Sequence, residues 1–118
     1  MPTQPRKIIF LVTEDWYFCS HRLPLAVAAK TAGFDVAVIT RVVNHGELIR
    51  QSGIRIIPFN ISRRSMNPLK ELAVILRLCS IYRSERPDIV HHVAMKPVLY
   101  GSIAARLTGI LHVINALA

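Results

Sequence analysis

The stretch Lys7–Arg22, KIIFLVTEDWYFCSHR, decides the fold of this chain, because an apolar strand gives way there to an amphipathic helix. Lys7–Thr13 is β-branched, aromatic and apolar on successive residues, which is typical of a strand buried on both faces. A helix is predicted from Ser20 or His21 to Ala32, where apolar residues recur at helical spacing and Gly33 follows as a stop. The two elements enclose a short, polar and aromatic turn.

The same alternation continues along the rest of the chain. Further strands are predicted at 34–40, 54–59, 88–93 and 111–117, and further helices within 44–53, at 68–85 and at 96–109. Only the segment 60–67 has the polar composition of a linker. Strands and helices that alternate with short connections indicate the α/β class, with a parallel sheet covered by helices on both faces.

Length and composition limit the possible classes of protein. A chain of 118 residues, 52% of them hydrophobic, is long enough for one domain with a real core and too short for two. We therefore predict a single domain over residues 1–118. Because a doubly wound domain normally continues past its fifth strand, we expect this chain to be the front part of a longer polypeptide.

The charge balance is strongly basic, with a formal net charge of +8, and this favours an anionic partner. The basic residues are spread from Arg6 to Arg106 instead of clustering with aromatic residues on one element, which argues against nucleic acid. Two cysteines are too few for a disulfide framework and indicate a reduced, cytoplasmic protein. No signal peptide or membrane-spanning apolar run is visible, so any association with the inner face of the plasma membrane would be peripheral.

The junction after the first strand carries the first group of candidate binding residues. Ligands of open parallel sheets bind beyond the carboxyl ends of the strands, and carboxylates, aromatic faces and basic groups there suit hydroxyls, sugar rings and phosphate respectively. The candidates at this junction are Glu14, Asp15, Trp16, Ser20, His21 and Arg22. The alternative interpretation is that the aromatic residues fold back onto the core and the two carboxylates cap the helix.

The same junction contains no glycine; the first glycine of the chain is Gly33. A dinucleotide-binding protein would show G-x-G-x-x-G here, and a phosphate-binding ATPase would show G-x-x-x-x-G-K-[ST]. Both functions are disfavoured on that basis. The polar and aromatic residues of this crevice are instead expected to hold a ligand that carries hydroxyl groups.

The fourth strand ends in the second group, within HHVAMKP, residues 91–97. Adjacent residues of a strand point to opposite faces, so His91 and His92 cannot easily share a metal ion, and no metal site is predicted. His91 is a candidate for hydrogen bonding or proton transfer, Lys96 for phosphate, and Asn115 marks the end of the fifth strand. At least one histidine of the pair is expected to be an ordinary core residue.

The helix at 68–85 is apolar over much of its circumference, with basic residues along it. A basic amphipathic helix on anionic lipid is one interpretation, and a helix buried against the sheet is the favoured one. The neighbouring loop carries Arg63 and Arg64, which are the candidates for contact with lipid phosphate or a membrane.

Three segments resemble the N-terminal half of family 4 glycosyltransferases: SHRLPLA after the first strand, PDIVHHVAMKP at the fourth, and INALA at the close. The similarity covers nearly the whole chain and is greatest to the branch that builds bacterial surface polysaccharides on a lipid-linked acceptor. It implies a Rossmann-like domain of the two-domain GT-B architecture, in a retaining enzyme that uses a nucleotide sugar.

This resemblance also implies a division of labour. The N-terminal domain holds a glycan or lipid-linked acceptor, while the nucleotide-sugar donor binds a C-terminal domain that these residues do not include. No cofactor is therefore expected in this chain, and alone it should be catalytically silent. Family members commonly show H-x-H at the fourth strand, of which only His91 clearly matches, and no catalytic residue is carried over to the fifth strand end.

Two alternatives remain open from the sequence. One is a non-catalytic Rossmann-like module that docks a partner or an anionic membrane; the other, which is disfavoured, is a flavodoxin-like or response-regulator-like domain. The leading hypothesis expects the loops after strands one, four and five to converge on one pocket. Its predicted lining is Glu14, His21, His91 and Lys96.

Overall fold

The computed structural model describes residues 6–60 and 67–116 of the chain. Strands and helices alternate as predicted, except that two helices follow the first strand. In chain order the elements are β1 (Lys7–Glu14), α1 (Asp15–His21), α2 (Leu23–Thr31), β2 (Asp35–Arg41), α3 (Gly46–Gln51), β3 (Arg55–Pro58), α4 (Pro68–Glu85), β4 (Ile89–Val93), α5 (Met95–Thr108) and β5 (His112–Ala116). The predicted ends agree with these bounds to within one or two residues, except at the start of the first helix.

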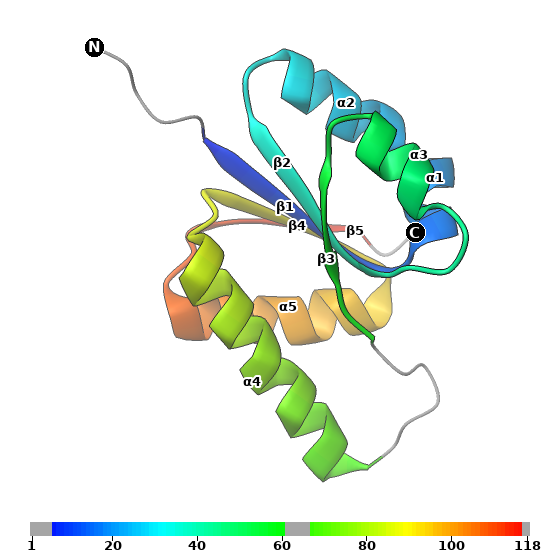
Figure 1. Ribbon diagram of the computed structural model, residues 1–118. Coiled ribbons are helices and arrows are strands. Elements are labelled where there is room, and N and C mark those ends of the chain that lie inside the picture. Colours follow the sequence, from blue (N-terminus) through cyan, green and yellow to red (C-terminus); the bar gives the residue numbers. More distant parts are fainter. Residues whose placement is uncertain (1–5, 61–66, 117–118) are drawn as a thin grey trace.

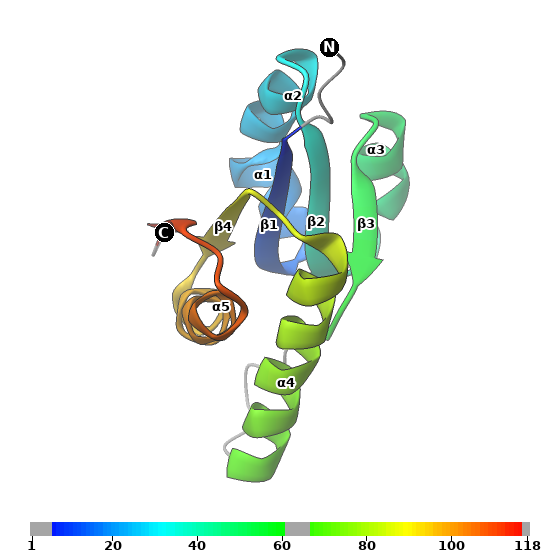
Figure 2. The ribbon, with the colours of Figure 1, turned by 90° about the vertical axis from the view of Figure 1, so that its left-hand side faces the viewer.

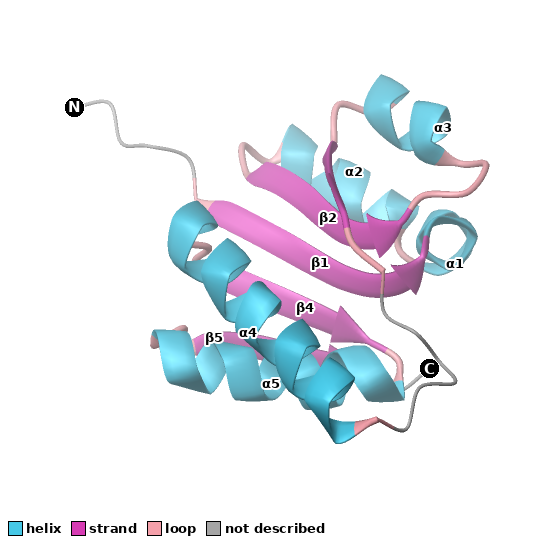
Figure 3. Cartoon of the chain, turned by 60° about the horizontal axis from the view of Figure 1, so that its bottom comes forward, coloured by secondary structure: helices cyan, strands magenta, loops and turns pink. Residues whose placement is uncertain are grey.

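The five strands form one sheet in the order β3-β2-β1-β4-β5, and all neighbouring pairs are parallel. The chain therefore builds outward from β1 through β2 to β3, then returns to the other side of β1 for β4. This reversal places the topological switch point between the carboxyl ends of β1 and β4. In Figure 3 these ends lie at the same edge of the sheet, next to α1 and the start of α5.

Helices cover both faces of the sheet, which confirms the predicted fold class. On one face Phe18 of α1, Ala26 of α2 and Ile49 of α3 pack with alternate residues of β1 and β2. On the other face Leu78 of α4 and Ala104 of α5 pack with the intervening residues of the same strands. Figure 1 shows α1, α2 and α3 on one side of the strands and α4 and α5 on the other.

The first helical region differs from the prediction, because it consists of two helices instead of one. Asp15 follows β1 directly and begins α1, so Trp16 lies in a helix and not in a turn. The chain breaks at Arg22, whose φ of −129° is not helical, and α2 then begins. In an unbroken helix Pro24 would clash with the carbonyl of Ser20 and could not donate to it, which explains the break.

Glycines follow three of the helices, and the stop predicted at Gly33 is confirmed. Gly33, Gly53 and Gly109 follow α2, α3 and α5, and their φ angles are 103°, 82° and 78°. A residue with a Cβ is strained in this left-handed region, so glycine ends these helices at little cost.

The environment of α4 also differs from the favoured prediction of a well-buried helix. Its inner face packs on the sheet, but Leu69, Leu72 and Leu76 are 77%, 52% and 58% exposed. In Figure 2 the N-terminal part of α4 extends past the strands, so that no sheet lies beneath it. None of the helices within 6–60 and 67–116 has the length and hydropathy needed to cross a bilayer.

Candidate binding site at the carboxyl edge of the sheet

Asp15 lies at the switch point, but its carboxylate is fully buried and engaged by backbone. Its oxygens accept the N–H groups of Trp16, Val43 and His45, each at 2.8 Å. Burial alone would raise the pKa of Asp15, but these three donors and the nearby His45 ring lower it below its ordinary value. Asp15 therefore ties the turn after β2 to the start of α1, and contact with a ligand stays a prediction for this residue.

The exposed side of α1 carries an aromatic cluster, formed by Trp16, Tyr17 and His21. Trp16 is 41% exposed and its ring meets Tyr17 edge to face, with ring centroids 5.6 Å apart. Tyr17 stacks on His21 at 4.1 Å. The Trp16 indole N–H donates to the carboxylate of Glu14, which fixes the indole ring at the end of β1. Such a surface suits the apolar face of a sugar ring beside a carboxylate that accepts hydroxyl hydrogens.

Ser20 and His21 stand at the C-terminal end of α1, so the prediction that they open a helix was wrong. Ser20 is exposed and lies one turn from Trp16, on the same side of the helix. Arg22 forms the junction of α1 and α2, and its Nη1 donates to the carbonyl of His21 at 3.1 Å. Arg22 therefore lies at the N-terminus of α2 and at the C-terminal end of α1. A phosphate could contact Arg22 at the start of α2, but not at the start of α1.

The two adjacent histidines of β4 point to opposite faces and are both buried, which confirms the expectation from the sequence. His91 stacks on Phe10 at 5.0 Å, on the face covered by α1 and α2. Burial, and next the positive charge of Arg22, lower the pKa of His91, so its ring is neutral at neutral pH. Within the described parts of the chain its Nε2 has no hydrogen-bond partner.

His92 faces α4 and α5 on the other side of the sheet. Its Nε2 lies 2.9 Å from the Tyr82 hydroxyl and its Nδ1 lies 2.8 Å from Oδ1 of Asn115. Gly101 of α5 passes directly over the ring. Asn115 was predicted from the sequence, whereas Tyr82 and Gly101 were not, because no local pattern links positions on two helices to a strand.

The turn between β4 and α5 completes the edge. Ala94 has a φ of 78°, which only glycine adopts easily, and its N–H donates to the carbonyl of Ala116 at 2.8 Å. This bond fixes the start of α5 against the end of β5. Lys96 lies in the first turn of α5, where the helix dipole adds partial positive charge.

The structure brings the predicted residues to one edge of the sheet, but it divides them between two faces. His91 and Arg22 lie on the face of α1 and α2, whereas Asn115 lies on the face of α5. The described residues form two cavities at the opposite edge of the sheet, where the strands begin. Neither cavity is lined by any residue of the predicted pocket, which was expected to consist of Glu14, His21, His91 and Lys96. Arg63 and Arg64 lie outside the described residues, so their predicted membrane contact stays a prediction.

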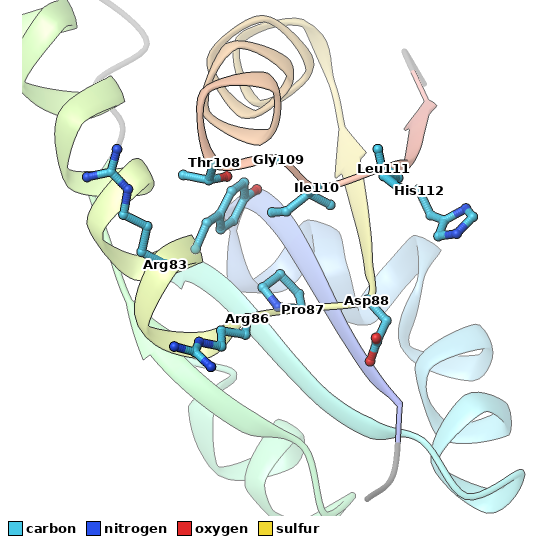
Figure 4. A pocket seen from close by; sticks show the side chains of 10 residues that line it. Arg83, Arg86, Pro87, Asp88, Thr108, Gly109, Ile110, Leu111 and His112 are labelled. Carbon is cyan, nitrogen blue, oxygen red and sulfur yellow. The ribbon is translucent and has the colours of Figure 1, made fainter.

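The larger of those cavities has a volume of about 670 Å³ and opens where β4 and β5 begin. Figure 4 shows Arg83 and Arg86 on one side of it and Asp88 and His112 on the other. The Asp88 carboxylate accepts the backbone N–H of Lys7 at 2.7 Å. Parallel sheets bind ligands at the carboxyl ends of their strands, and this cavity lies at the amino ends, so we place the candidate site at the other edge.

Comparison with known proteins identifies the family. The profile of a family described as glycosyl transferase 4-like matches residues 7–118. A search of curated proteins found no match.

Solved structures share the fold at low sequence identity. A glycosyltransferase from Rickettsia africae ESF-5 aligns with a TM-score of 0.78 and 18% identity over 96% of this chain and 30% of that one. MurG of Acinetobacter baumannii aligns with a TM-score of 0.68 and 23% identity, over 94% of this chain and 33% of that one. The C-terminal domain of a hydrogenase from Pyrococcus furiosus aligns with a TM-score of 0.64 and 16% identity, over 99% and 96%.

These likenesses show the fold, and the chain spans about a third of the length of the two glycosyltransferases. The five-stranded parallel sheet with helices on both faces matches the N-terminal domain of GT-B glycosyltransferases. Since the family profile covers all but the first six residues, the chain belongs to the glycosyl transferase 4-like family.

Proposed function

We propose that this chain is the acceptor-binding half of a retaining, nucleotide-sugar-dependent glycosyltransferase. Its acceptor is a lipid-linked saccharide used in surface-polysaccharide synthesis, and the enzyme works in the cytoplasm at the inner face of the membrane. The donor sugar nucleotide binds a separate C-terminal domain. Membership of the glycosyl transferase 4-like family and the GT-B fold support the class of the reaction.

The observation that carries the proposal is the chemistry of the β1–α1 junction. A phosphate-binding turn needs free backbone N–H groups at the start of the helix. Here the Asp15 carboxylate already accepts the N–H of Trp16 and adds negative charge at that position. A nucleotide diphosphate would be repelled there, whereas Glu14 and the aromatic cluster beside it suit a sugar.

Trp16 is the only tryptophan of the chain, so its fluorescence reports directly on this junction. We expect a saturable change in Trp16 emission when a short-chain polyprenyl diphosphate-linked monosaccharide is added, and none with nucleotide sugars. Glu14→Gln should weaken binding of this probe about tenfold, the loss of one charged hydrogen bond. Glu47→Gln removes an exposed carboxylate of α3; it is the control and should bind as the wild type does.

A nucleotide sugar that binds here with higher affinity than the lipid-linked saccharide would contradict the proposal. When the chain is assayed together with a donor-binding domain, we expect sugar transfer with retained anomeric configuration, measured by NMR of the product. Transfer with inversion would reject the retaining mechanism and leave the acceptor role intact.

A second function, docking to an anionic membrane, is favoured by the exposed side of α4. Leu69, Leu72 and Leu76 are spaced by three and four residues and form one apolar stripe, which we call the leucine stripe. The exposed charges of α4 are all basic: Lys70, Arg77 and Arg83. Leucines flanked by cations on a projecting helix match an anionic bilayer.

The acidic groups of α4 face inward and do not oppose such a contact. Glu71 accepts the Tyr100 hydroxyl hydrogen at 3.0 Å, and Glu85 pairs with Arg55 at 2.9 Å. The negative charges are thus held against the body of the protein.

Sedimentation with vesicles tests this docking. We expect the chain to bind vesicles that contain anionic lipid and to bind purely zwitterionic vesicles weakly. Leu72→Gln with Leu76→Gln should reduce binding about tenfold or more, since about 1.5–3 kcal/mol accompanies burial of each leucine. Leu99→Gln on α5, where the leucine is 55% exposed, is the control. Equal loss with the control variant would reject α4 as the contact.

A further inference from the structure

His92 connects three elements through its two ring nitrogens. It is fully buried in β4, with Tyr82 of α4 bonded to Nε2 and Asn115 of β5 bonded to Nδ1. The ring therefore links a residue of the core to a residue at the exposed edge strand. We call the three residues the Tyr82–His92–Asn115 relay.

The chemistry of the three groups fixes where each proton lies. The Asn115 contact is made by its amide oxygen, which only accepts, so Nδ1 of His92 carries the hydrogen and donates it. Burial lowers the pKa of His92, so the ring is neutral and Nε2 has a lone pair. Burial raises the pKa of Tyr82, so its hydroxyl keeps its hydrogen and donates it to Nε2.

Packing prevents the ring from leaving this position. A Cβ at Gly101 would lie 2.3 Å from Nε2 and 2.4 Å from Cδ2 of His92. The backbone of α5 thus closes over the imidazole as closely as a glycine permits. The ring is held from above by α5 and at its Nε2 by Tyr82.

The relay also fixes which side of the Asn115 carboxamide faces outward. Oδ1 accepts from His92 and also from the Ser102 hydroxyl at 3.3 Å, so both of its lone pairs are used. The NH2 group of the carboxamide then points away from these partners. Asn115 is an exposed residue of β5. It directly precedes Ala116, whose carbonyl accepts the N–H of Ala94 in the β4–α5 turn.

We propose that the Tyr82–His92–Asn115 relay presents the Asn115 NH2 group as a hydrogen-bond donor to a phosphate oxygen of the acceptor. The inference rests on the proposed function, because it takes the acceptor to be the ligand of this edge. His92 is a positioning residue, and Asn115 makes the contact. Lys96 and the N-terminus of α5 lie at the same β4–α5 turn and add positive charge, which favours phosphate over a neutral oxygen.

The proton positions are tested on the free chain by ¹⁵N NMR of the histidine side chains. We expect His92 to be protonated at Nδ1 and unprotonated at Nε2, the opposite of the tautomer that predominates in free histidine. In Tyr82→Phe the Nε2 resonance should shift while Nδ1 stays protonated. A His92 protonated at Nε2 alone would overturn the inference, because Asn115 would then turn its oxygen outward.

The contact is tested by affinity for the polyprenyl diphosphate-linked monosaccharide. Asn115→Asp replaces the donor with an anion and should weaken binding at least tenfold, as for a lost bond to a charged group. His92→Phe keeps the ring volume without a donor and should weaken binding similarly. His92→Gln can accept from Tyr82 and donate to Asn115, so it should bind within about threefold of the wild type.

The outcomes separate this inference from the proposed function. If the wild type binds the probe and all three variants bind equally well, the relay is wrong and the acceptor role stands. If the wild type does not bind the probe, the proposed function fails and the inference falls with it. Should His92→Phe not fold, as judged by thermal melting, the comparison of Asn115→Asp with His92→Gln decides; a loss in both variants overturns the role of the relay.

Discussion

Gly101 has a role that runs against the usual preference of helices. In a helix interior, alanine is more stable than glycine by about 1 kcal/mol. Here a Cβ would lie 2.3 Å from the imidazole of His92, whose ring is bonded on both sides and has no room to move. We therefore expect Gly101→Ala to lower the free energy of unfolding by about 1–3 kcal/mol, the usual cost of overpacking.

Urea denaturation of Gly101→Ala, His92→Ala and the double variant measures this. In the double variant the space left by the imidazole accommodates the new methyl group, so the effects should be less than additive. Arg106→Ala, at an exposed position of the same helix, controls for helix propensity. A Gly101→Ala protein as stable as the wild type would show that the contact with His92 is looser than described.

Asp15 should make stability depend on pH in the acid range. Its folded pKa is lowered, so the stability it contributes is fully present above the unfolded pKa of about 4 and is lost as pH falls through the folded value. Asp15→Asn should cost about 1–3 kcal/mol at neutral pH, because one buried backbone donor loses a charged acceptor. Below about pH 4 the free energy of unfolding should also fall less steeply with decreasing pH in this variant than in the wild type.

The check is the free energy of unfolding from urea titrations between neutral and acid pH. The pKa of Glu85 is lowered as well, first by its bond to Arg55, so Glu85→Gln serves as the comparison. An Asp15→Asn protein with the same acid profile as the wild type would assign the pH dependence to other carboxylates.

Single residues show why the site was only partly predictable from the sequence. Glu14, Asp15 and Asn115 were chosen because they lie at or near the ends of predicted strands, and strand ends could be read from local pattern. That Asp15 faces backbone and not solvent depends on Val43 and His45 of another loop. Contacts of this kind are set by tertiary packing, which a local pattern does not contain.

Among the elements, α4 begins with a side-chain cap. Oδ1 of Asn67 accepts the N–H of Leu69 at 3.0 Å, and Pro68 occupies the first helical position. We expect Asn67→Ala to lower the free energy of unfolding by about 1 kcal/mol through loss of this cap. Asn67→Asp, which keeps the acceptor oxygen, should be close to the wild type in the same chemical denaturation experiment, and equal losses in both would exclude capping as the cause.

The first helical region shows the limit of reading elements from the sequence. Pro24 lies in the first turn of α2. The earlier helix α1 was missed because Asp15 to Ser20 was interpreted as a polar turn, although Phe18 is a core residue. A seven-residue helix gives too few turns for a period to be recognised, so only tertiary contacts reveal it.

At the scale of the whole molecule, stability should decrease from the centre of the sheet to its edges. β1 lies between β2 and β4 and has helices on both faces, whereas β5 is paired only with β4 among the described strands and is mostly exposed. We expect amide hydrogen exchange to be slowest in β1 and fastest in β5, because edge strands open at lower free energy. Exchange measured residue by residue by NMR checks this, and a β5 as protected as β1 would contradict it.

The class of the fold was predictable because alternation of strands and helices is a property of the whole chain. Each of the nine predicted segments needed only an approximate assignment for a parallel sheet to follow. The exposure of α4 was not predictable, because its apolar residues fill most of the circumference and only the position of the sheet determines which leucines are covered.

The outer side of β5 has a practical consequence for anyone who wishes to extend this protein. Its backbone amides and carbonyls on that side form a template along which one more strand could bind without displacing the other five. A synthetic peptide of alternating β-branched and polar residues would be a suitable probe. A fluorophore attached to this peptide would report its binding along the outer edge of β5.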